Sequence, residues 1–203
     1  MIKRQVIKID DLLTDNEMKL LESELLILNK KLEQTIKIYD NTTISSLHRV
    51  YLDDEYEFNR NDSYILNIIT SKLFSESTMN RIGTIEPLLR LIPFSNEHET
   101  QYTVYEEGGE YSWHLDSIAP QNRIANFILY LNDDFEGGEL ELSYRTDLDS
   151  NLKCLYNPSV DSVIIPKKNT LVIMPSDMWH RVKPITKGKR KTINGHIGFR
   201  RKF

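Results

Sequence analysis

The hydrophobic residues of this chain repeat with two different periods. Near the N-terminus, apolar residues recur every three or four positions across residues 13–34, as expected for a helix with one buried face. Thr14 and Glu17 stand three apart at the start of this stretch, which is the spacing of a capping box. A second apolar stripe within residues 61–77 has the same period. The first part of the chain therefore predicts two amphipathic helices that pack on a core.

From about residue 84 the pattern changes to short runs of β-branched and aromatic residues, most of them bounded by Gly, Pro, Asn or Asp. Many short strands without intervening helices favour a sandwich, a jelly roll or a barrel. We therefore predict a mainly β, α+β protein: a double-stranded β-helix (jelly roll) with helices packed on one sheet. The chain is expected to form a single domain over residues 1–203, with a helical support region at 1–83 and the jelly-roll core at 84–203.

Composition narrows the classes of function. The chain has 203 residues, of which 39% are hydrophobic and 28% are charged, and this balance is typical of globular proteins. Its net charge of −4 argues against a nucleic-acid partner. No apolar run approaches the length of about 20 residues that spans a membrane, and the first residues lack the apolar segment of a signal peptide. Cys154 is the only cysteine, which excludes a disulfide within the chain, so we expect a cytoplasmic protein without membrane contact.

The segment GGEYSWHLDS, residues 108–117, contains the first candidate for chemistry. His114 and Asp116 are two positions apart, and on a strand such residues point to the same face. His180 begins a later predicted strand and can reach them, because a jelly roll brings distant strands together. Two histidines and one carboxylate around a metal with open positions suit a non-haem Fe(II) oxygenase. The simpler alternative is that His180 is a structural histidine bonded to the backbone at a strand end.

Arg190 is the candidate anchor for a second ligand. A hairpin through residues 185–189 that pairs His180 with Asn194 would place His180 and Arg190 on one face. A small dicarboxylate fits between a metal at His180 and the guanidinium of Arg190, whose planar fork binds carboxylates through two hydrogen bonds. The same register places further polar residues on that face, namely Thr192, Asn194 and His196. Alternatively, Arg190 is one more member of the basic turn KGKRK at 187–191.

The run RIANFILYLN, residues 123–132, separates a polar face from an apolar one. One face carries Asn126, Ile128 and Tyr130, while the other is wholly apolar and is expected to meet the core or a helix. The phenol of Tyr130 could donate a hydrogen bond to the far carboxylate of the same ligand. The alternative is an ordinary half-buried tyrosine.

Together these segments resemble the iron- and 2-oxoglutarate-dependent dioxygenases, specifically the prolyl 4-hydroxylase-like branch. The resemblance covers about residues 100–199 and rests on QYTVYEEGGEYSWHLDS, RIANFILYLNDDFEGGELEL and NTLVIMPSDMWHRVKPITKGKR. It implies three ligands for Fe(II), His114, Asp116 and His180, which form the catalytic set together with Arg190. It also implies cofactor-binding residues for 2-oxoglutarate, namely Arg190, Tyr130 and Tyr105, and substrate-side residues, namely Tyr111 and His196.

The resemblance implies an Fe(II)- and 2-oxoglutarate-dependent dioxygenase, similar to procollagen-proline 4-dioxygenases, that consumes O2 and has ascorbate as an accessory reductant. The implied substrate is a prolyl residue of a peptide or protein, which is hydroxylated at an unactivated C–H bond. Metal loading is expected to fail at acid pH, because both histidines must be neutral to bind iron.

Two residues depart from the pattern of the family. Collagen-type relatives usually carry Lys at the position of Arg190, and some relatives carry Trp at that of His196. Two alternatives therefore stay open: the same chemistry on a free amino acid or another small metabolite, and a non-catalytic metal-binding jelly-roll module. A nucleic-acid demethylase of the same superfamily fits the acidic charge balance poorly. The loop at residues 143–162 is a candidate lid, with a plain surface insertion as its alternative.

Overall fold

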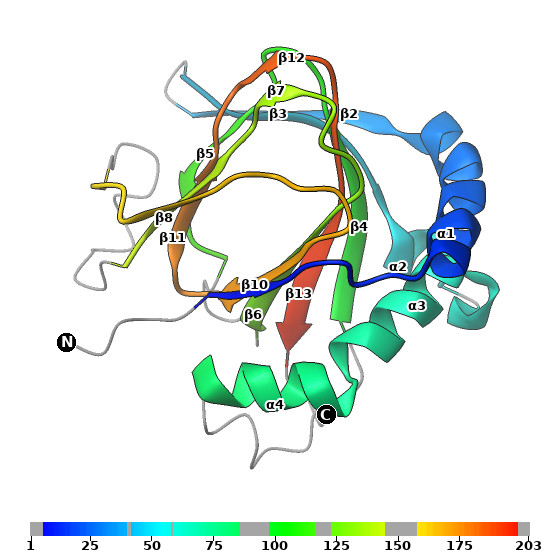
Figure 1. Ribbon diagram of the computed structural model, residues 1–203. Helices are drawn as coiled ribbons and strands as arrows, with labels where there is room; N and C mark the ends of the chain where they lie inside the picture. Colours follow the sequence, from blue (N-terminus) through cyan, green and yellow to red (C-terminus); the bar gives the residue numbers. More distant parts are fainter. Residues whose placement is uncertain are drawn as a thin grey trace, which may run out of the picture.

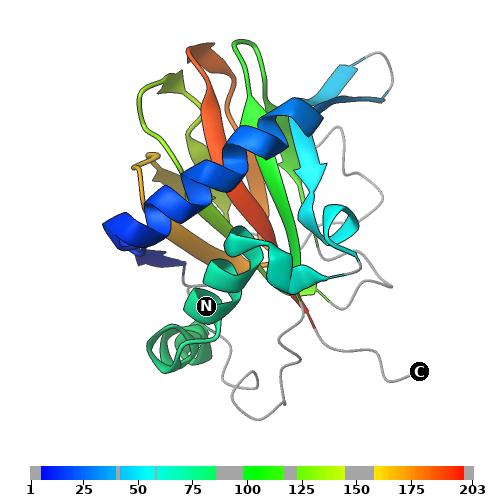
Figure 2. The same ribbon diagram turned by 90° about the vertical axis from the view of Figure 1, so that its right-hand side faces the viewer.

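The protein is built around one large antiparallel sheet, which Figures 1 and 2 show from two directions. The computed structural model describes residues 6–39, 42–57, 59–85, 98–116, 123–144 and 158–198. In these ranges the main sheet has eleven strands, most of which follow the order β1-β10-β6-β13-β4-β3-β5-β11-β8-β9. Strand β2 pairs with β3 beside this path, and a separate two-stranded sheet joins β12 to β7.

The strands are β1 (Ile7–Ile9), β2 (Glu33–Tyr39), β3 (Thr42–Tyr51), β4 (His98–Tyr105), β5 (Tyr111–His114), β6 (Arg123–Tyr130), β7 (Glu136–Gly137), β8 (Leu140–Ser143), β9 (Ser162–Ile164), β10 (Leu171–Pro175), β11 (Trp179–Val182), β12 (Ile185–Lys187) and β13 (Arg190–Gly198). The helices are α1 (Asp15–Leu28), α2 (Leu52–Glu55), α3 (Tyr64–Leu73) and α4 (Glu76–Ile85), with 3-10 turns η1 (Asn29–Lys31) and η2 (Arg60–Asp62).

The main sheet rolls up into two facing walls. Strands β6, β13 and β4 lie side by side in one wall, and β5, β11 and β8 lie side by side in the other. Strand β3 pairs with both β4 and β5, so it joins the two walls along one side. This rolled antiparallel sheet with a few helices confirms the predicted jelly roll (Figure 1).

The helices pack on the outer face of the wall formed by β4, β6 and β13 (Figure 2). Helix α1 begins with the predicted capping box, in which Thr14 and Glu17 bond reciprocally. Its buried residues Leu21, Leu25 and Leu28 belong to the same apolar core as residues of these strands. Among the described helices, none is long and apolar enough to cross a lipid bilayer.

The two faces of β6 line two different cores, and the wholly apolar face meets the core beneath the helices, as the sequence predicts. Phe127 and Leu129 belong to the core beneath the helices, together with Ala125. Ile128 and Tyr130 belong to a second core that lies between the two walls. Because side chains alternate along a strand, one wall can support the helices on one face and line an interior space on the other.

The N-terminal region differs from the prediction of a purely helical support. Besides its helices, it contributes β1 and the hairpin of β2 and β3 to the main sheet. The hairpin was not predicted. Its strand β2 lies at the sheet edge, where Ile36 and Ile38 are 52% and 65% exposed, so the apolar residues of β2 do not belong to the core. Helix α4 also runs past the expected boundary at residue 84. Residues 86–97 of a predicted strand region, and residues 145–157 of the candidate lid, lie outside the described residues.

Candidate metal centre and active site

The two walls enclose a cavity of about 270 Å³. Most of the predicted site residues line it, although they come from four different strands and from the segment after β5; they are Tyr105, Tyr111, His114, Asp116, His180, Arg190 and His196. Tyr130 lies next to this set, with its ring centroid 5.0 Å from the guanidinium carbon of Arg190. The fold therefore gathers all the predicted site residues around one interior space.

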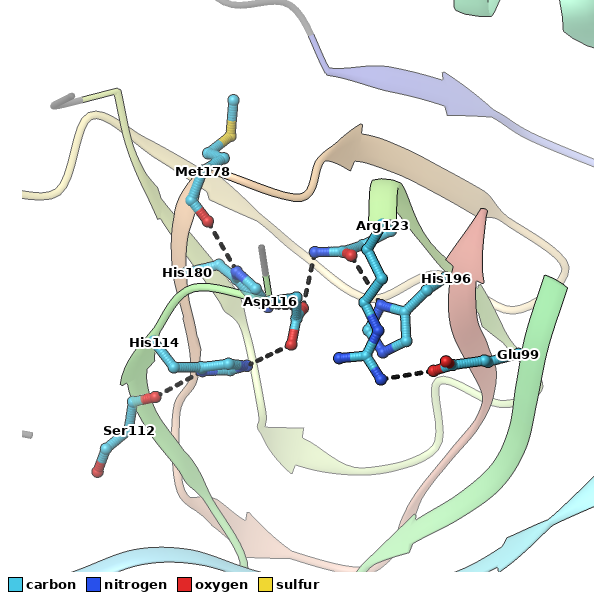
Figure 3. Close-up of polar contacts among 9 residues, drawn as sticks. Glu99, Ser112, His114, Asp116, Arg123, Met178, His180 and His196 are labelled. Atoms are coloured by element: carbon cyan, nitrogen blue, oxygen red, sulfur yellow. Dashed lines mark hydrogen bonds and ion pairs between the residues drawn. The ribbon is translucent and has the colours of Figure 1, made fainter. Parts of the chain in front are cut away.

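Three side chains converge on one point in this cavity. The ligand atoms of His114, Asp116 and His180 all lie within 4.8 Å of one another. Nε2 of His180 is 3.2 Å from Oδ2 of Asp116, and Nε2 of His114 is 3.8 Å from Oδ1 (Figure 3). Since metal–ligand bonds to nitrogen and oxygen are about 2 Å long, one ion can contact all three groups.

Strand pairing and a bend bring these groups together. His180 of β11 is the direct partner of His114 of β5, and the two ring centroids are 4.1 Å apart. Strand β5 ends at His114, so Asp116 does not continue it as the sequence suggests. Instead, the backbone N–H of Asp116 donates to the carbonyl of Ser176, 3.1 Å away, and this bond turns the carboxylate toward the imidazoles.

Hydrogen bonds determine which nitrogen of each imidazole faces the centre. Nδ1 of His114 lies 2.8 Å from the carbonyl of Ser112, and Nδ1 of His180 lies 2.9 Å from the carbonyl of Met178 (Figure 3). A carbonyl can only accept, so Nδ1 carries a proton in both rings, and Nε2 is the nitrogen that has a free lone pair whenever the ring is neutral. The free lone pairs point at the centre, as in histidines that bind a metal.

Arg190 lies in the opposite wall, at the start of β13, and its side chain is buried. Its guanidinium carbon is 5.1 Å from the ring centroid of Tyr105 and 5.0 Å from that of Tyr130. Among the described residues, Nε and Nη2 of Arg190 and the hydroxyl of Tyr130 have no hydrogen-bond partner. Burial raises the pKa of Tyr105 to about 12 and also raises that of Tyr130, although the guanidinium opposes both shifts. The phenols therefore keep their protons, and the group offers several buried donors to an anion.

The predicted hairpin between His180 and Arg190 is wrong, although both residues do face the cavity. Strand β11 pairs with β5 and β8, whereas β13 pairs with β4 and β6 in the other wall. Between them, β12 pairs with β7, where Ile185 lies opposite Gly137. Gly137 has a φ of +79°, and a Cβ there would lie 2.3 Å from the carbonyl oxygen of Pro184. This glycine permits the close contact by which the chain crosses from one wall to the other.

Comparison with known families supports this reading of the geometry. Residues 100–198 match the family described as the 2OG-Fe(II) oxygenase superfamily, and the matched segment contains the whole His-Asp-His cluster and Arg190. The matched segment, just under half of the chain, belongs to the 2OG-Fe(II) oxygenase superfamily. Members of this superfamily use Fe(II), 2-oxoglutarate and O2.

The proteins that this chain resembles include hydroxylases. A PKHD-type hydroxylase from Gloeothece citriformis is 28% identical over 113 residues, which are 49% of this chain and 42% of that protein. The match thus spans less than half the length of that relative. The fold is similar to that of a prolyl-4-hydroxylase from Pseudomonas putida (TM-score 0.65, 16% identity, 98% of this chain and 95% of that chain). It is also similar to a Trichoplax adhaerens prolyl hydroxylase in complex with a hypoxia inducible factor peptide fragment (TM-score 0.66, 16% identity, 96% and 84% of the chains).

The residues present fit the cofactors of the superfamily. Two neutral imidazole nitrogens and a carboxylate form the ligand set that suits non-haem Fe(II) and leaves coordination positions open. The unpartnered donors of Arg190 and Tyr130 in the facing wall fit the distal carboxylate of a dicarboxylate such as 2-oxoglutarate.

The electrostatics of the cluster favour binding of a divalent cation. Burial by itself would raise the pKa of Asp116, but the imidazoles of His180 and His114 outweigh burial and hold this pKa well below its usual range. Burial and the neighbouring His180 lower the pKa of His114 to about 3. For His180, burial lowers the pKa, but the contact with Asp116 raises it by more. At neutral pH the carboxylate is charged and His114 is neutral, which are the states that bind a metal.

Asn126 and His196 hold the carboxylate in place. Nδ2 of Asn126 donates to Oδ2 of Asp116 at 2.7 Å, and Oδ1 of Asn126 lies 2.9 Å from Nδ1 of His196. A carboxylate only accepts hydrogen bonds, so the NH2 group of Asn126 must face Asp116 and its oxygen must face His196. Nδ1 of His196 therefore donates to Oδ1 of Asn126. Asn126 is therefore a positioning residue for Asp116, and His196, which resemblance placed on the substrate side, supports it.

Replacing Asn126 with alanine is expected to weaken metal binding by about 10- to 100-fold, as is usual for residues that orient a ligand. The measurement is calorimetric titration of metal-free protein with Mn(II), which takes the same ligands. Asn67→Ala, on the exposed side of α3, is the matched control and should keep the affinity of the unaltered protein. Equal Mn(II) affinities for the two variants would contradict the positioning role.

Several residues of the cavity were not predicted from the sequence. Lys37 comes from β2, and Arg49 and Tyr51 come from β3, which together form the hairpin that the hydrophobic pattern did not reveal. Glu99 and Arg123 also line the cavity and form an ion pair between β4 and the start of β6 (Figure 3). The alternation of Leu47, Arg49 and Tyr51 would have marked β3 as a strand, but not its position against β5.

Proposed function

We propose that this protein is an Fe(II)- and 2-oxoglutarate-dependent dioxygenase that hydroxylates an unactivated C–H bond of a prolyl residue in a peptide or protein. In this reaction one oxygen atom of O2 enters the C–H bond. The other enters succinate as 2-oxoglutarate loses carbon dioxide. His114, Asp116 and His180 are the metal ligands, and Arg190 binds the distal carboxylate of 2-oxoglutarate.

The observation that carries this proposal is the pair of unpartnered donors on the buried guanidinium of Arg190. The side chain is 1% exposed, yet Nε and Nη2 lack partners among the described residues. Leaving buried donors of a charged group without acceptors is costly, so the site is built to receive an anion. That anion position shares a cavity with the His-Asp-His cluster. A structural metal site would not need it, and this argues against the alternative of a non-catalytic module.

Each residue of the site has a defined task. The bound iron supplies the activation of O2 and the oxidising power, and the protein supplies position, charge and exclusion of water. Arg190 and the phenol of Tyr130 hold one end of 2-oxoglutarate through charge-assisted hydrogen bonds. The ring of Tyr105 packs against the same guanidinium, 5.1 Å away. Asn126 keeps the carboxylate of Asp116 turned toward the metal.

The prolyl substrate is supported by the fold and by the side chains next to the metal ligands. Both solved structures named above are prolyl hydroxylases, and one of them holds a peptide fragment. Tyr111 stacks on His114 with ring centroids 3.8 Å apart, so its ring lies next to a metal ligand in the cavity. An aromatic side chain at this position offers apolar contact to a compact ring such as that of proline.

Turnover of 2-oxoglutarate tests the proposed function. Purified protein is incubated with Fe(II), 2-oxoglutarate and O2, and succinate is measured with proline-containing peptides, with free proline and without substrate. Peptide-dependent succinate together with a mass gain of one oxygen on proline is the expected result. Stimulation by free proline alone would replace the peptide by a small metabolite. Iron binding without any consumption of 2-oxoglutarate would contradict an oxygenase.

A further inference from the structure

Three cations gather at the rim of the active-site cavity, and only one of them is neutralised. Arg123 forms an ion pair with Glu99, with 2.5 Å between Nη2 and Oε2. Lys37 and Arg49 also line the cavity, from the hairpin of β2 and β3. Within the described ranges, neither has a carboxylate partner. Lys37 contacts the Tyr111 ring, and Arg49 bonds Thr35 and stacks on Tyr51. One side of the rim is therefore electrically balanced and the hairpin side is positive.

The two unpaired cations lie close to the metal position. The ammonium of Lys37 is 5.8 Å from the ring centroid of Tyr111, and that ring stacks on His114. The connection is built into the sheet, because Ser45 is the register partner of Lys37 on one side and of Tyr111 on the other. A group held by Lys37 would thus lie about one aromatic ring away from a metal ligand.

Arg49 faces the same space from the neighbouring strand. It pairs with Thr103 of β4, two residues before Tyr105, whose ring packs on Arg190. Its Nε donates to the hydroxyl of Thr35 at 3.2 Å, which fixes the stem and leaves the terminal N–H groups of the guanidinium for a ligand. The guanidinium carbon is 5.0 Å from the ring centroid of Tyr51, which lines the cavity at its side.

The proposed metal and co-substrate do not account for these charges. The distal carboxylate of 2-oxoglutarate belongs to Arg190, and the metal is neutralised by Asp116 and the other end of the co-substrate. Burial and the neighbouring guanidinium of Arg49 lower the pKa of Lys37, and Arg123 adds to this repulsion, while the carboxylate of Asp116, which the metal would engage, opposes them without reversing the shift. Cations that repel one another at a cavity, and that form no ion pair with a carboxylate among the described residues, favour binding of an anion there.

We propose that the substrate carries a carboxylate close to the carbon that is oxidised, and that Lys37 and Arg49 bind this carboxylate. The inference rests on the proposed oxygenase function and narrows its substrate class. The carboxylate belongs either to an acidic residue beside the target residue of a peptide or to a small free acid. A nucleic acid fits less well, because its regularly spaced phosphates require an extended basic track, and the chain as a whole has a net charge of −4.

Matched ligands and matched variants test this inference by binding, independently of turnover. The probes are three capped pentapeptides that differ only in carrying Glu, Gln or Lys on both sides of a central proline, together with N-acetylproline as the free acid and its amide as the neutral counterpart. Each is titrated calorimetrically into protein loaded with Mn(II) and 2-oxoglutarate. The variants are Lys37→Gln, Arg49→Gln and Lys37→Glu. Lys187→Gln is the charge-matched control, since this lysine is 73% exposed on β12 and does not line the cavity.

The Glu peptide, or the free acid if the substrate is small, is expected to bind at least about tenfold more tightly than its neutral counterpart, as one charge-assisted hydrogen bond provides. Each Gln variant should remove about that factor, whereas Lys187→Gln should not. Lys37→Glu should shift the preference toward the Lys peptide. The preference should also weaken as salt is raised. The KM for 2-oxoglutarate should stay unchanged in Lys37→Gln and Arg49→Gln.

Failure of this inference differs from failure of the proposed function. Equal binding of the acidic, neutral and basic ligands would overturn the carboxylate proposal. So would variants that raise the KM for 2-oxoglutarate instead of weakening substrate binding, because Lys37 and Arg49 would then belong to the co-substrate site. If acidic ligands bind through these residues but the Fe(II) protein makes no succinate with any of them, the carboxylate site stands and the oxygenase proposal falls.

Discussion

Replacing Asp116 with alanine is expected to abolish the formation of succinate from 2-oxoglutarate. Asp116 supplies the only carboxylate of the His-Asp-His cluster, and its oxygens lie 3.2 Å and 3.8 Å from the two Nε2 atoms. Without it, two neutral imidazoles remain, which cannot neutralise a divalent cation. Since residues that only orient a ligand cost about 10- to 100-fold in metal affinity, loss of the ligand itself should exceed about 100-fold.

The measurement combines Mn(II) titration of the metal-free protein with succinate formation in the presence of Fe(II). Asp54→Ala is the matched control, because Asp54 is exposed on α2 and lies outside the cavity. The thermal midpoint of each metal-free variant shows whether the change acts on folding rather than on the site. Succinate formation at the normal rate by a folded Asp116→Ala protein would exclude this cluster as the catalytic metal centre.

Removing the guanidinium of Arg190 is expected to raise the KM for 2-oxoglutarate by about 30-fold or more. Truncating one partner of a buried, hydrogen-bonded charge pair costs about 2–5 kcal/mol, and each 1.4 kcal/mol is a factor of about ten. Because Arg190 is fully buried between two tyrosines, Arg190→Ala also opens a void. Arg190→Met keeps most of the volume and separates the loss of charge from the loss of packing.

Two further variants sharpen this test. Arg190→Lys keeps the charge but loses the planar fork, so its KM for 2-oxoglutarate should lie between those of the unaltered protein and Arg190→Met. Lys189→Ala removes the neighbouring cation, whose side chain is 58% exposed and paired with Glu106, and should leave the KM unchanged. If Arg190→Met folds and keeps its affinity for 2-oxoglutarate, another residue anchors the co-substrate.

Local sequence patterns were sufficient to predict several elements of this protein. The helical period and the capping box at Thr14 predict α1, because helix ends and faces depend on neighbours a few residues apart. The alternation in the run 123–132 predicts which side chains of β6 face the helices and which face the interior. Residue types and spacing also indicate iron chemistry, because His-x-Asp combined with a distant histidine and arginine is typical of few other kinds of site.

Strand neighbours, in contrast, were decided only by the tertiary structure. The sequence suggests that His180 and Arg190 belong to one hairpin, but they lie in opposite walls and face the same cavity. Periodicity defines the face of a strand and not its partner, since pairing depends on contacts between residues far apart in the chain. The pairing of β12 with β7, with its close contact at Gly137, also depends on residues far apart in the chain.

The residues around the metal ligands show the same division. The sequence is sufficient to predict His114, Asp116 and His180 as candidate metal ligands, because metals require particular donor atoms. The roles of Asn126, Lys37 and Arg49 are not, because an amide or a cation becomes part of a site only through what the fold places beside it. The sequence alone thus determined the chemistry of the centre, and the rolled sheet decided its support and its charged rim, since these arise from contacts between distant strands.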